Sequence, residues 1–249
     1  MLAYHSVGDV DPHDDQHSLF TPVHAFTRQM TVLARGRRVV PLEEVLAGTA
    51  PRGSVALTFD DGYRGVLEHA VPVLERLSLP STMFVPTGYV GDRNRWNAPT
   101  GLDLSIMSVD EMRECERRGM RMESHGHAHL DMRTTTAEET RADLIRSREV
   151  LAEHLGRVPD LLAWPFRTGS PAAQDVARQV GFRAAFSIDL LGGGPFARPR
   201  VQISPQDGHL MFWLKTTGRY LELRHSPAAD KAYRRSVKPL LRGRWTQSQ

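Results

Sequence analysis

The sequence predicts an α/β protein built as a parallel barrel, and three observations lead to this expectation. Short apolar runs typical of buried strands alternate about seven times with longer segments of helical periodicity. At 249 residues and 40% hydrophobic composition, the chain is long enough for one domain with a sizeable core. The side chains most suited to chemistry follow directly on apolar runs, as in barrels whose active sites lie at the C-terminal ends of the strands.

The first half of the chain begins with an apolar run at residues 2–7, which reads as a strand. Residues 21–36 are expected to form a helix in which Phe26, Met30 and Leu33 share one face. We expect further strands at 38–41, 55–60 and 82–85, and helices at 42–46 and 66–77. A glycine-marked loop then covers residues 87–101. Trp96 in this loop is either a wall on which a sugar stacks or a cover for the core.

The second half continues the alternation. We expect helices at 108–118, 136–155 and 171–180, and strands at 121–124, 161–166, 184–188 and 198–201. The helix at 136–155 has acidic residues early and basic residues late, as the helix dipole favours. Asp189 ends the strand at 184–188 and is either a site residue or a turn carboxylate.

Two adjacent carboxylates end the strand at 55–60. The stretch Val55-Ala56-Leu57-Thr58-Phe59-Asp60-Asp61-Gly62 is too short for a helix and closes on a glycine. Neighbouring aspartates repel each other unless a cation or a proton separates their roles. The stretch therefore indicates either a functional site or a surface turn.

A histidine cluster follows about sixty residues later. His125 and His129 are spaced so that a tight loop or one helical turn brings both imidazoles to one ion, whereas His127 points elsewhere. One carboxylate and two histidines leave a divalent metal with open positions for water and substrate, which is the catalytic pattern. The same ligand set also describes non-haem iron oxygenases, but the second aspartate beside the ligand has an obvious task only in a hydrolase.

Residues 58–62 and 124–129 resemble the first two motifs of the polysaccharide deacetylases, the NodB-homology class or family 4 carbohydrate esterases. Pro72-Val73-Leu74 and Ser81-Thr82-Met83-Phe84-Val85 resemble the helix and second strand that follow the first motif there. The resemblance implies a distorted barrel of seven or so β/α units. It also implies a hydrolase that removes N-acetyl groups from an amino sugar or polysaccharide and releases acetate.

By the same resemblance, Asp60 is the general base, and Asp61, His125 and His129 hold a divalent metal. We expect Zn²⁺, with Co²⁺ or Ni²⁺ as alternatives. The family's last motif is an aliphatic strand ending in a histidine that acts as general acid. In the branch of exopolysaccharide deacetylases this strand comes first, and Leu2-Ala3-Tyr4-His5 resembles it, which implies His5 as the acid. His225 is the competing candidate, although its neighbours have a helical charge pattern.

Residues 161–167 resemble the third motif with two departures. Ala163 occupies the position of an arginine that orients the base, and Arg167 occupies that of a glycine. A glycine there permits backbone geometry that other residues resist, so we expect Arg167 to reshape the loop. The match implies that the Phe166 amide donates to the oxyanion. Arg200, in the late strand, is a candidate to approach Asp60 in place of the missing arginine.

Two other functions remain open. One is a cyclic-imide or ureide amidohydrolase of related fold, which the intact metal residues disfavour. The other is a sugar-binding protein that has lost catalysis, which the altered third motif favours and the retained base and metal residues disfavour. The substrate is expected to be a carbohydrate or small amino sugar, with no nucleic acid as partner; the oligomeric state is left open.

The whole chain, residues 1–249, is expected to form one catalytic domain with a basic tail from about residue 215. From Lys215 to Arg244 there are nine basic residues against Glu222 and Asp230, which indicates a solvated tail or contact with an anionic glycan, lipid head group or nucleotide-linked substrate. The single cysteine, Cys115, excludes an internal disulfide. Without a membrane-length apolar run or a secretory signal, we expect a cytoplasmic protein, or a secreted one if the chain is a trimmed form.

Overall fold

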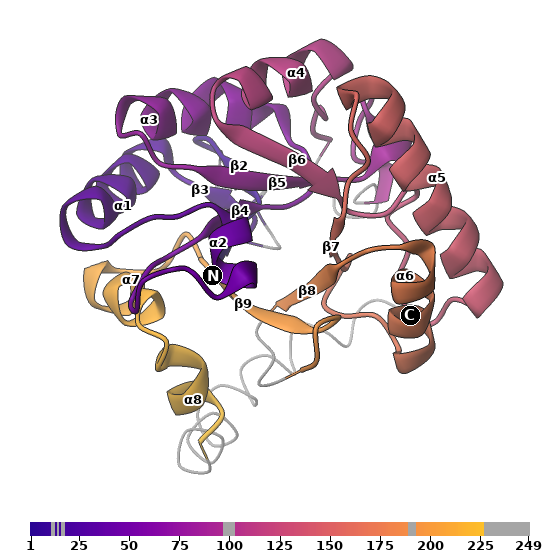
Figure 1. Ribbon diagram of the computed structural model, residues 1–249. Coiled ribbons are helices and arrows are strands. Elements are labelled where there is room, and N and C mark those ends of the chain that lie inside the picture. Colours follow the sequence, from indigo (N-terminus) through magenta and orange to yellow (C-terminus); the bar gives the residue numbers. More distant parts are fainter. Residues whose placement is uncertain (11–12, 14, 16–17, 97–102, 189–192, 227–249) are drawn as a thin grey trace.

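Seven parallel strands close into a barrel with helices around it, which confirms the predicted fold (Figure 1). The computed structural model describes residues 1–226, apart from 11–12, 14, 16–17, 97–102 and 189–192. The strands in spatial order are β1 (Leu2–Tyr4), β4 (Leu57–Phe59), β5 (Ser81–Val85), β6 (Met120–Ser124), β7 (Leu161–Ala163), β8 (Ala184–Ile188) and β9 (Arg198–Gln202). Because β1 pairs with both β4 and β9, the first strand of the chain closes the barrel.

The six predicted helices form in the predicted order with small shifts at their ends, and the one predicted at 66–77 is divided in two; the turn at 87–89 and the helix at 209–216 were not predicted. The helices and helical turns are α1 (Val23–Gly36), α2 (Leu42–Ala47), the π-helical turn η1 (Val66–Ala70), α3 (Val71–Arg76), the 3₁₀ turn η2 (Thr87–Tyr89), α4 (Val109–Arg117), α5 (Ala137–Leu155), α6 (Pro171–Val180), α7 (His209–Thr216) and α8 (Tyr220–Arg224). The first helix begins at Val23 because Thr21 pairs with Val7, joining β2 (Ser6–Val7) to β3 (Phe20–Thr21). The strand predicted at 38–41 is wrong: only a bridge between Val39 and Val55 forms there.

Capping boxes start two of the helices that pack on the barrel. The Ser108 hydroxyl accepts a hydrogen bond from the backbone N–H of Glu111 at the start of α4, and Thr136 does the same for Glu139 at the start of α5. Each glutamate reaches back to the backbone N–H of its capping residue, so the free N–H groups of the first turn find acceptors. These polar side chains fix where two long helices begin on the barrel surface.

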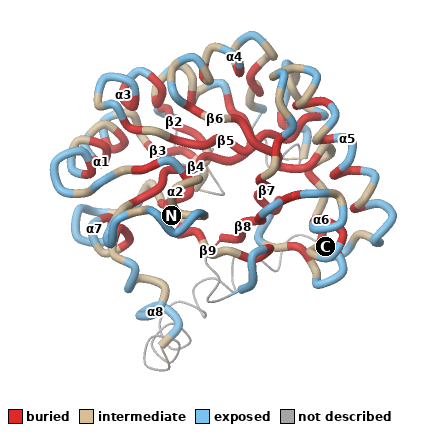
Figure 2. The backbone as a smooth tube through the Cα atoms, viewed as in Figure 1, coloured by how far each residue is buried: buried red, intermediate tan, exposed pale blue. Residues whose placement is uncertain are grey.

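The buried apolar residues form one large cluster and two smaller ones. The large cluster includes Phe26, Met30 and Leu33, the three α1 residues that the sequence places on one face. One of the smaller clusters holds Phe84 and Phe186, whose ring centroids lie 5.6 Å apart, together with Leu42, Ala56, Leu161, Ala163 and Ala184. Figure 2 shows the strands as buried and the outer sides of the helices as exposed. None of the helices within the described residues is long and apolar enough to cross a membrane.

A fully buried carboxylate on β6 joins several segments. Glu123 accepts hydrogen bonds from Arg121 at 2.6 Å, from Arg157 at 3.0 Å and from the backbone N–H of Leu161 at 2.9 Å. Arg121 also pairs with Glu43 of α2 at 2.9 Å. This network ties β6 to the start of β7 and to α2, and its removal leaves buried donors without acceptors.

We therefore predict that Glu123→Leu lowers the free energy of unfolding by about 3–5 kcal/mol, because both arginines lose a buried carboxylate partner and the backbone N–H groups of Asp160 and Leu161 lose their acceptor. The matched control is Glu114→Leu, which removes an exposed carboxylate paired with Arg117 on α4 and costs at most about 1 kcal/mol. Urea denaturation followed by circular dichroism measures both. Equal destabilisation by the two substitutions would contradict a structural role for the buried network.

Candidate metal and catalytic site

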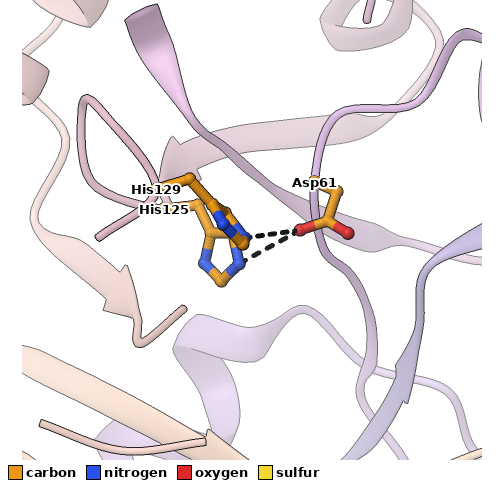
Figure 3. Close-up of side chains that lie close together, drawn as sticks. All are labelled: Asp61, His125 and His129. Atoms are coloured by element: carbon orange, nitrogen blue, oxygen red, sulfur yellow. Dashed lines mark hydrogen bonds and ion pairs between the residues drawn. The ribbon is translucent and has the colours of Figure 1, made fainter. Parts of the chain in front are cut away.

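The C-terminal ends of parallel strands bring the predicted metal ligands together. Asp61 lies two residues beyond β4, and His125 follows β6 directly. His129 lies at the far side of the short loop that begins at His125. Because neighbouring parallel strands end at one side of the barrel, residues more than sixty positions apart in sequence meet there (Figure 3).

Asp61, His125 and His129 form a compact buried group. Asp61 Oδ1 lies 3.3 Å from His125 Nε2 and 3.2 Å from His129 Nε2, and one ligand atom from each residue lies within 4.8 Å of the others. The two imidazole rings meet edge to face with centroids 5.1 Å apart. All three side chains are buried, so solvent does not screen the group.

The donor set fits a divalent cation. The carbonyl of Ala163 lies 2.8 Å from His125 Nδ1 and accepts its proton, which leaves Nε2 with a lone pair facing Asp61. A lone pair and a carboxylate oxygen at this distance repel each other unless a cation or a proton lies between them. Among the described residues, the buried Nδ1 of His129 has no hydrogen-bond partner. The ring is held by the contact of its Nε2 with Asp61 and by the aromatic rings beside it. Two imidazoles and one carboxylate leave open positions on a metal such as zinc.

The loop that carries both histidines is fixed by Asp143 on α5. The buried carboxylate of Asp143 accepts the backbone N–H groups of His127 at 2.8 Å and Ala128 at 2.7 Å. Gly126 has a φ of 77°, and a Cβ there would lie 2.8 Å from an oxygen of Asp143, so glycine is required. His127 Nδ1 lies 2.9 Å from the Thr87 hydroxyl, so this histidine is held away from Asp61 by a partner of its own.

Asp60 lies beside this group and forms a bidentate ion pair with Arg200. Arg200 Nη1 lies 2.7 Å from Oδ1 and Nη2 lies 2.8 Å from Oδ2, with both side chains almost fully buried. Burial alone raises the pKa of Asp60, but the charges of Arg200 and His125 and the hydrogen bonds from Arg200 hold it below its usual value. Asp60 is therefore ionised at neutral pH. The guanidinium comes from β9, whereas Ala163 of β7 occupies the position of the missing arginine.

His5 reaches the same end of the barrel from β1. Tyr4 pairs with Phe59 in the barrel register, so His5 follows β1 at the level at which Asp60 follows β4. The His5 imidazole contributes to lowering the pKa of both Asp60 and Asp61, although burial and nearer partners have larger effects. The competing candidate, His225, is exposed and follows the outer helix α8.

Phe166 occupies a strained turn next to His129. Its φ is 64°, and the Arg167 N–H donates to the carbonyl of Pro165 at 2.8 Å, which makes Phe166 the apex of a three-residue turn. The left-handed residue of this turn is Phe166, whereas Arg167, which occupies the position of the family's glycine, is not among the residues with a positive φ. In the described part of the chain, the Phe166 N–H has no hydrogen-bond acceptor, which leaves it available.

Two aromatic rings flank His129. Trp96 stacks on it with centroids 4.2 Å apart and planes 20° apart, and the half-exposed Phe166 ring meets it edge-on at 5.0 Å. Trp96 also lies against the rings of Tyr63 and Tyr89, so it packs beside the metal-site histidine and not in the main core. Asp189, the remaining predicted residue, lies outside the described residues.

Backbone strain is concentrated at this site. Five non-glycine residues in the described chain have a positive φ, and three of them are Asp61 (72°), His129 (51°) and Phe166 (64°). Such conformations are unfavourable for residues with a Cβ and persist only where the surrounding structure enforces them, most often at functional sites. The strain supports a functional role for this group independently of its residue types.

Sequence reasoning missed Asp143 and Tyr63. Asp143 interrupts the buried face of α5, and an acid on that face is the only signal that the sequence offers. Tyr63 is almost fully buried; its burial raises the pKa of the phenol well above the usual value, and the negative charge of Asp61 and a hydrogen bond with it contribute. The Tyr63 hydroxyl also accepts a weak hydrogen bond from Asn94 at 3.5 Å. Asp143 thus holds the loop that carries the two histidines, and Tyr63 contacts the third ligand, Asp61.

The comparisons with known proteins agree with the geometry. The family model described as "Polysaccharide deacetylase" matches residues 47–185, more than half of the chain. A poly-beta-1,6-N-acetyl-D-glucosamine N-deacetylase of Staphylococcus aureus is 26% identical over 170 residues, which cover 63% of this chain and 57% of the relative. The chain thus spans little more than half of the length of that curated relative.

Solved structures show the same architecture. IcaB from Ammonifex degensii superimposes with a TM-score of 0.73 and 25% identity over 87% of this chain and 96% of that one. The Streptococcus pyogenes deacetylase PplD, in complex with acetate, superimposes with a TM-score of 0.74 over 86% of this chain and 96% of its own. At 18% identity the second likeness supports the fold alone.

We predict that Asp143→Ala weakens the binding of Zn²⁺ about tenfold or more. The two backbone N–H groups in the loop between His125 and His129 then lose the carboxylate that accepts their hydrogen bonds. Isothermal titration of the metal-free protein measures the affinity, and thermal unfolding checks that the fold survives. Asp143→Asn keeps one acceptor oxygen and should recover part of the affinity. Asp175→Ala, which removes an exposed acid on α6, is the control. Equal Zn²⁺ affinity in all three variants would show that Asp143 does not position the ligands.

Proposed function

The chain belongs to the polysaccharide deacetylase family, and from this premise we propose that it is a metal-dependent hydrolase that removes N-acetyl groups from an amino-sugar polymer and releases acetate. The observation that carries the proposal is the buried convergence of Asp61, His125 and His129 beside an ionised Asp60. The named activity of the Staphylococcus aureus relative favours β-1,6-linked N-acetylglucosamine as the substrate class.

Asp60 is the proposed general base. A divalent ion held by Asp61, His125 and His129 would supply Lewis-acid chemistry, polarising the amide carbonyl and lowering the pKa of water. Arg200 donates to both oxygens of Asp60, yet each carboxylate oxygen has a second lone pair, so Asp60 keeps an acceptor site for the proton of the attacking water. The fixed orientation removes the need for the carboxylate to reorient during the reaction.

The remaining roles fall to His5 and Phe166. The unpaired Phe166 N–H donates to the oxyanion that develops as water adds to the amide carbon. The leaving nitrogen must depart as a neutral amine, and His5, in its protonated form, supplies the proton. The level of His5 beside Asp60 supports this assignment, since the proposed base and acid follow the adjacent strands β4 and β1.

We assign this activity to a single catalytic domain formed by residues 1–249, with a basic tail from about residue 215. The support for this assignment is the pairing of β1 with β9, because the N-terminal strand and a strand near residue 200 complete the same barrel. The resident metal is proposed to be Zn²⁺, with Co²⁺ or Ni²⁺ as alternatives. The altered third motif was the argument for a sugar-binding protein without catalysis. Arg200 now makes the contact with Asp60 for which that motif lacked an arginine, which weakens that argument.

The test is acetate release from β-1,6-linked N-acetylglucosamine oligomers by the Zn²⁺-reconstituted protein. We expect release that stops on chelation and returns with added metal. Asp60→Asn should lower the rate at least about a hundredfold, because it removes the base while keeping the shape of the side chain. His5→Ala should lower it similarly, and His225→Ala, which removes an exposed histidine, should leave it unchanged.

Each contrary result points to a different error. Release that survives His5→Ala but falls in His225→Ala would move the general acid to His225. Metal binding without acetate release from any oligomer, together with hydrolysis of cyclic imides, would replace the deacetylase proposal by the amidohydrolase alternative. Oligomer binding with neither reaction would favour the sugar-binding protein.

Arg200 should act through Asp60 and not through substrate binding. We predict that Arg200→Met lowers kcat about a hundredfold with little change in KM, because the base loses its orientation. Arg200→Lys, which restores the charge without the planar fork, should recover only part of kcat. Arg198→Met on the same strand is the matched control, and circular dichroism verifies folding. A rise in KM at unchanged kcat would instead assign Arg200 to substrate binding.

A further inference from the structure

Helix α7 exposes three large apolar side chains close together, whereas α1, α5 and α8 each expose a single one. Five of its eight residues, His209–Thr216, are apolar, and Phe212 packs into the core. Leu210, Met211 and Trp213 point away from the core and are 81%, 43% and 53% exposed. Scattered exposed apolar residues are normal, but three within one turn of helix mark a surface that something covers.

Helix α1 extends this surface. Its Val32 is exposed, and Val32 and Arg28 line the same small hollow as His209 and Phe212 of α7. The Arg37 side chain, just beyond α1, lies over the Trp213 ring with Cζ 5.7 Å from the centroid, and its Nε donates to the Thr216 hydroxyl at 3.4 Å. The two helices also lie next to each other at one side of the barrel (Figure 1). We call this surface, made of Val32, Leu210, Met211 and Trp213 with Arg28, Arg35 and Arg37 around them, the α1–α7 face.

The charge of the α1–α7 face is positive. Neither α1 nor α7 contains an aspartate or glutamate, and both Arg28 and Arg35 are exposed. The Lys215 ammonium does not contribute, since it is buried and paired with Asp207 at 2.6 Å. The sequence that follows is also basic, with nine Lys and Arg from Lys215 to Arg244 against two acids.

Apolar residues surrounded by arginines fit an anionic lipid surface. Trp and Leu side chains insert at the level of the lipid head groups, and arginines bind the phosphates around them. A second copy of the chain fits less well, because a symmetric dimer would place the same arginines against each other. We propose that the α1–α7 face docks the protein on an anionic lipid bilayer, with Leu210, Met211 and Trp213 inserted among the head groups. This inference is independent of the proposed deacetylase activity.

The test is flotation of the full chain with vesicles of phosphatidylcholine, with and without phosphatidylglycerol. We expect binding to the anionic vesicles and little to the neutral ones. The double variant Leu210→Ser/Trp213→Ser should lower the partition coefficient at least about tenfold, because the inserted apolar area is lost. The matched control is Ile145→Ser/Val158→Ser, which removes two exposed apolar side chains elsewhere and should leave the partition coefficient unchanged.

The arginines give a second, electrostatic readout. Arg28→Ser/Arg35→Ser should lower binding about fivefold for each arginine removed and reduce its dependence on salt. Arg146→Ser, which removes an exposed arginine of α5, should have no such effect. Acetate release from a soluble oligomer should be the same in all of these variants, so a failed deacetylase proposal and a failed docking proposal remain distinguishable.

Three results would overturn the proposal. The first is the absence of binding to anionic vesicles. The second is binding that survives Leu210→Ser/Trp213→Ser but is lost in Arg234→Ser/Arg235→Ser, which would assign it to the C-terminal basic segment. The third is a dimer by light scattering that the Leu210→Ser/Trp213→Ser variant converts to a monomer, which would make the face an interface between copies.

Discussion

Two adjacent buried carboxylates, Asp60 and Asp61, are the constraint around which the site is built. Each would be costly to bury alone, and side by side they repel. The structure treats them differently: Asp60 receives a bidentate guanidinium, whereas Asp61 faces two imidazole nitrogens. One carboxylate is thereby held ionised by a fixed positive charge, and the other lies with His125 and His129 in a group that can hold a cation. The division gives two chemically identical neighbours different environments and allows them different roles.

Closure of the barrel makes this division possible. β9, β1 and β4 are consecutive neighbours, and they carry or precede Arg200, His5 and Asp60. The closing strand is the first in the chain, so groups separated by about 140 residues meet across two strand pairs. The same closure explains why the arginine that contacts Asp60 comes from β9, whereas β7 has Ala163 at the corresponding motif position. In a closed barrel, a side chain from any strand can reach the same interior point if it lies at the same height along the barrel axis.

The strained backbone at the site depends on rigid support around it. Asp61, His129 and Phe166 adopt unfavourable left-handed conformations close to the ends of β4, β6 and β7. Asp143 on a capped helix fixes the histidine loop, and the hydrogen bonds of the parallel strands fix the ends from which the loops depart. The buried Glu123 network secures β6 and β7, the two strands that precede His125 and Phe166. Precision at the site is thus supplied largely by residues that never touch it.

The sequence alone determined the alternation of strands and helices and singled out the four residues Asp60, Asp61, His125 and His129. Each of these signals is local: a periodicity, or a short motif at the end of an apolar run. Tertiary structure decided which arginine pairs with Asp60, that Asp143 anchors the histidine loop, that Phe166 carries the backbone strain, and that α7 presents its apolar side outward. These features depend on contacts between segments far apart in the chain, and no local pattern encodes which side chain arrives at the same point in space.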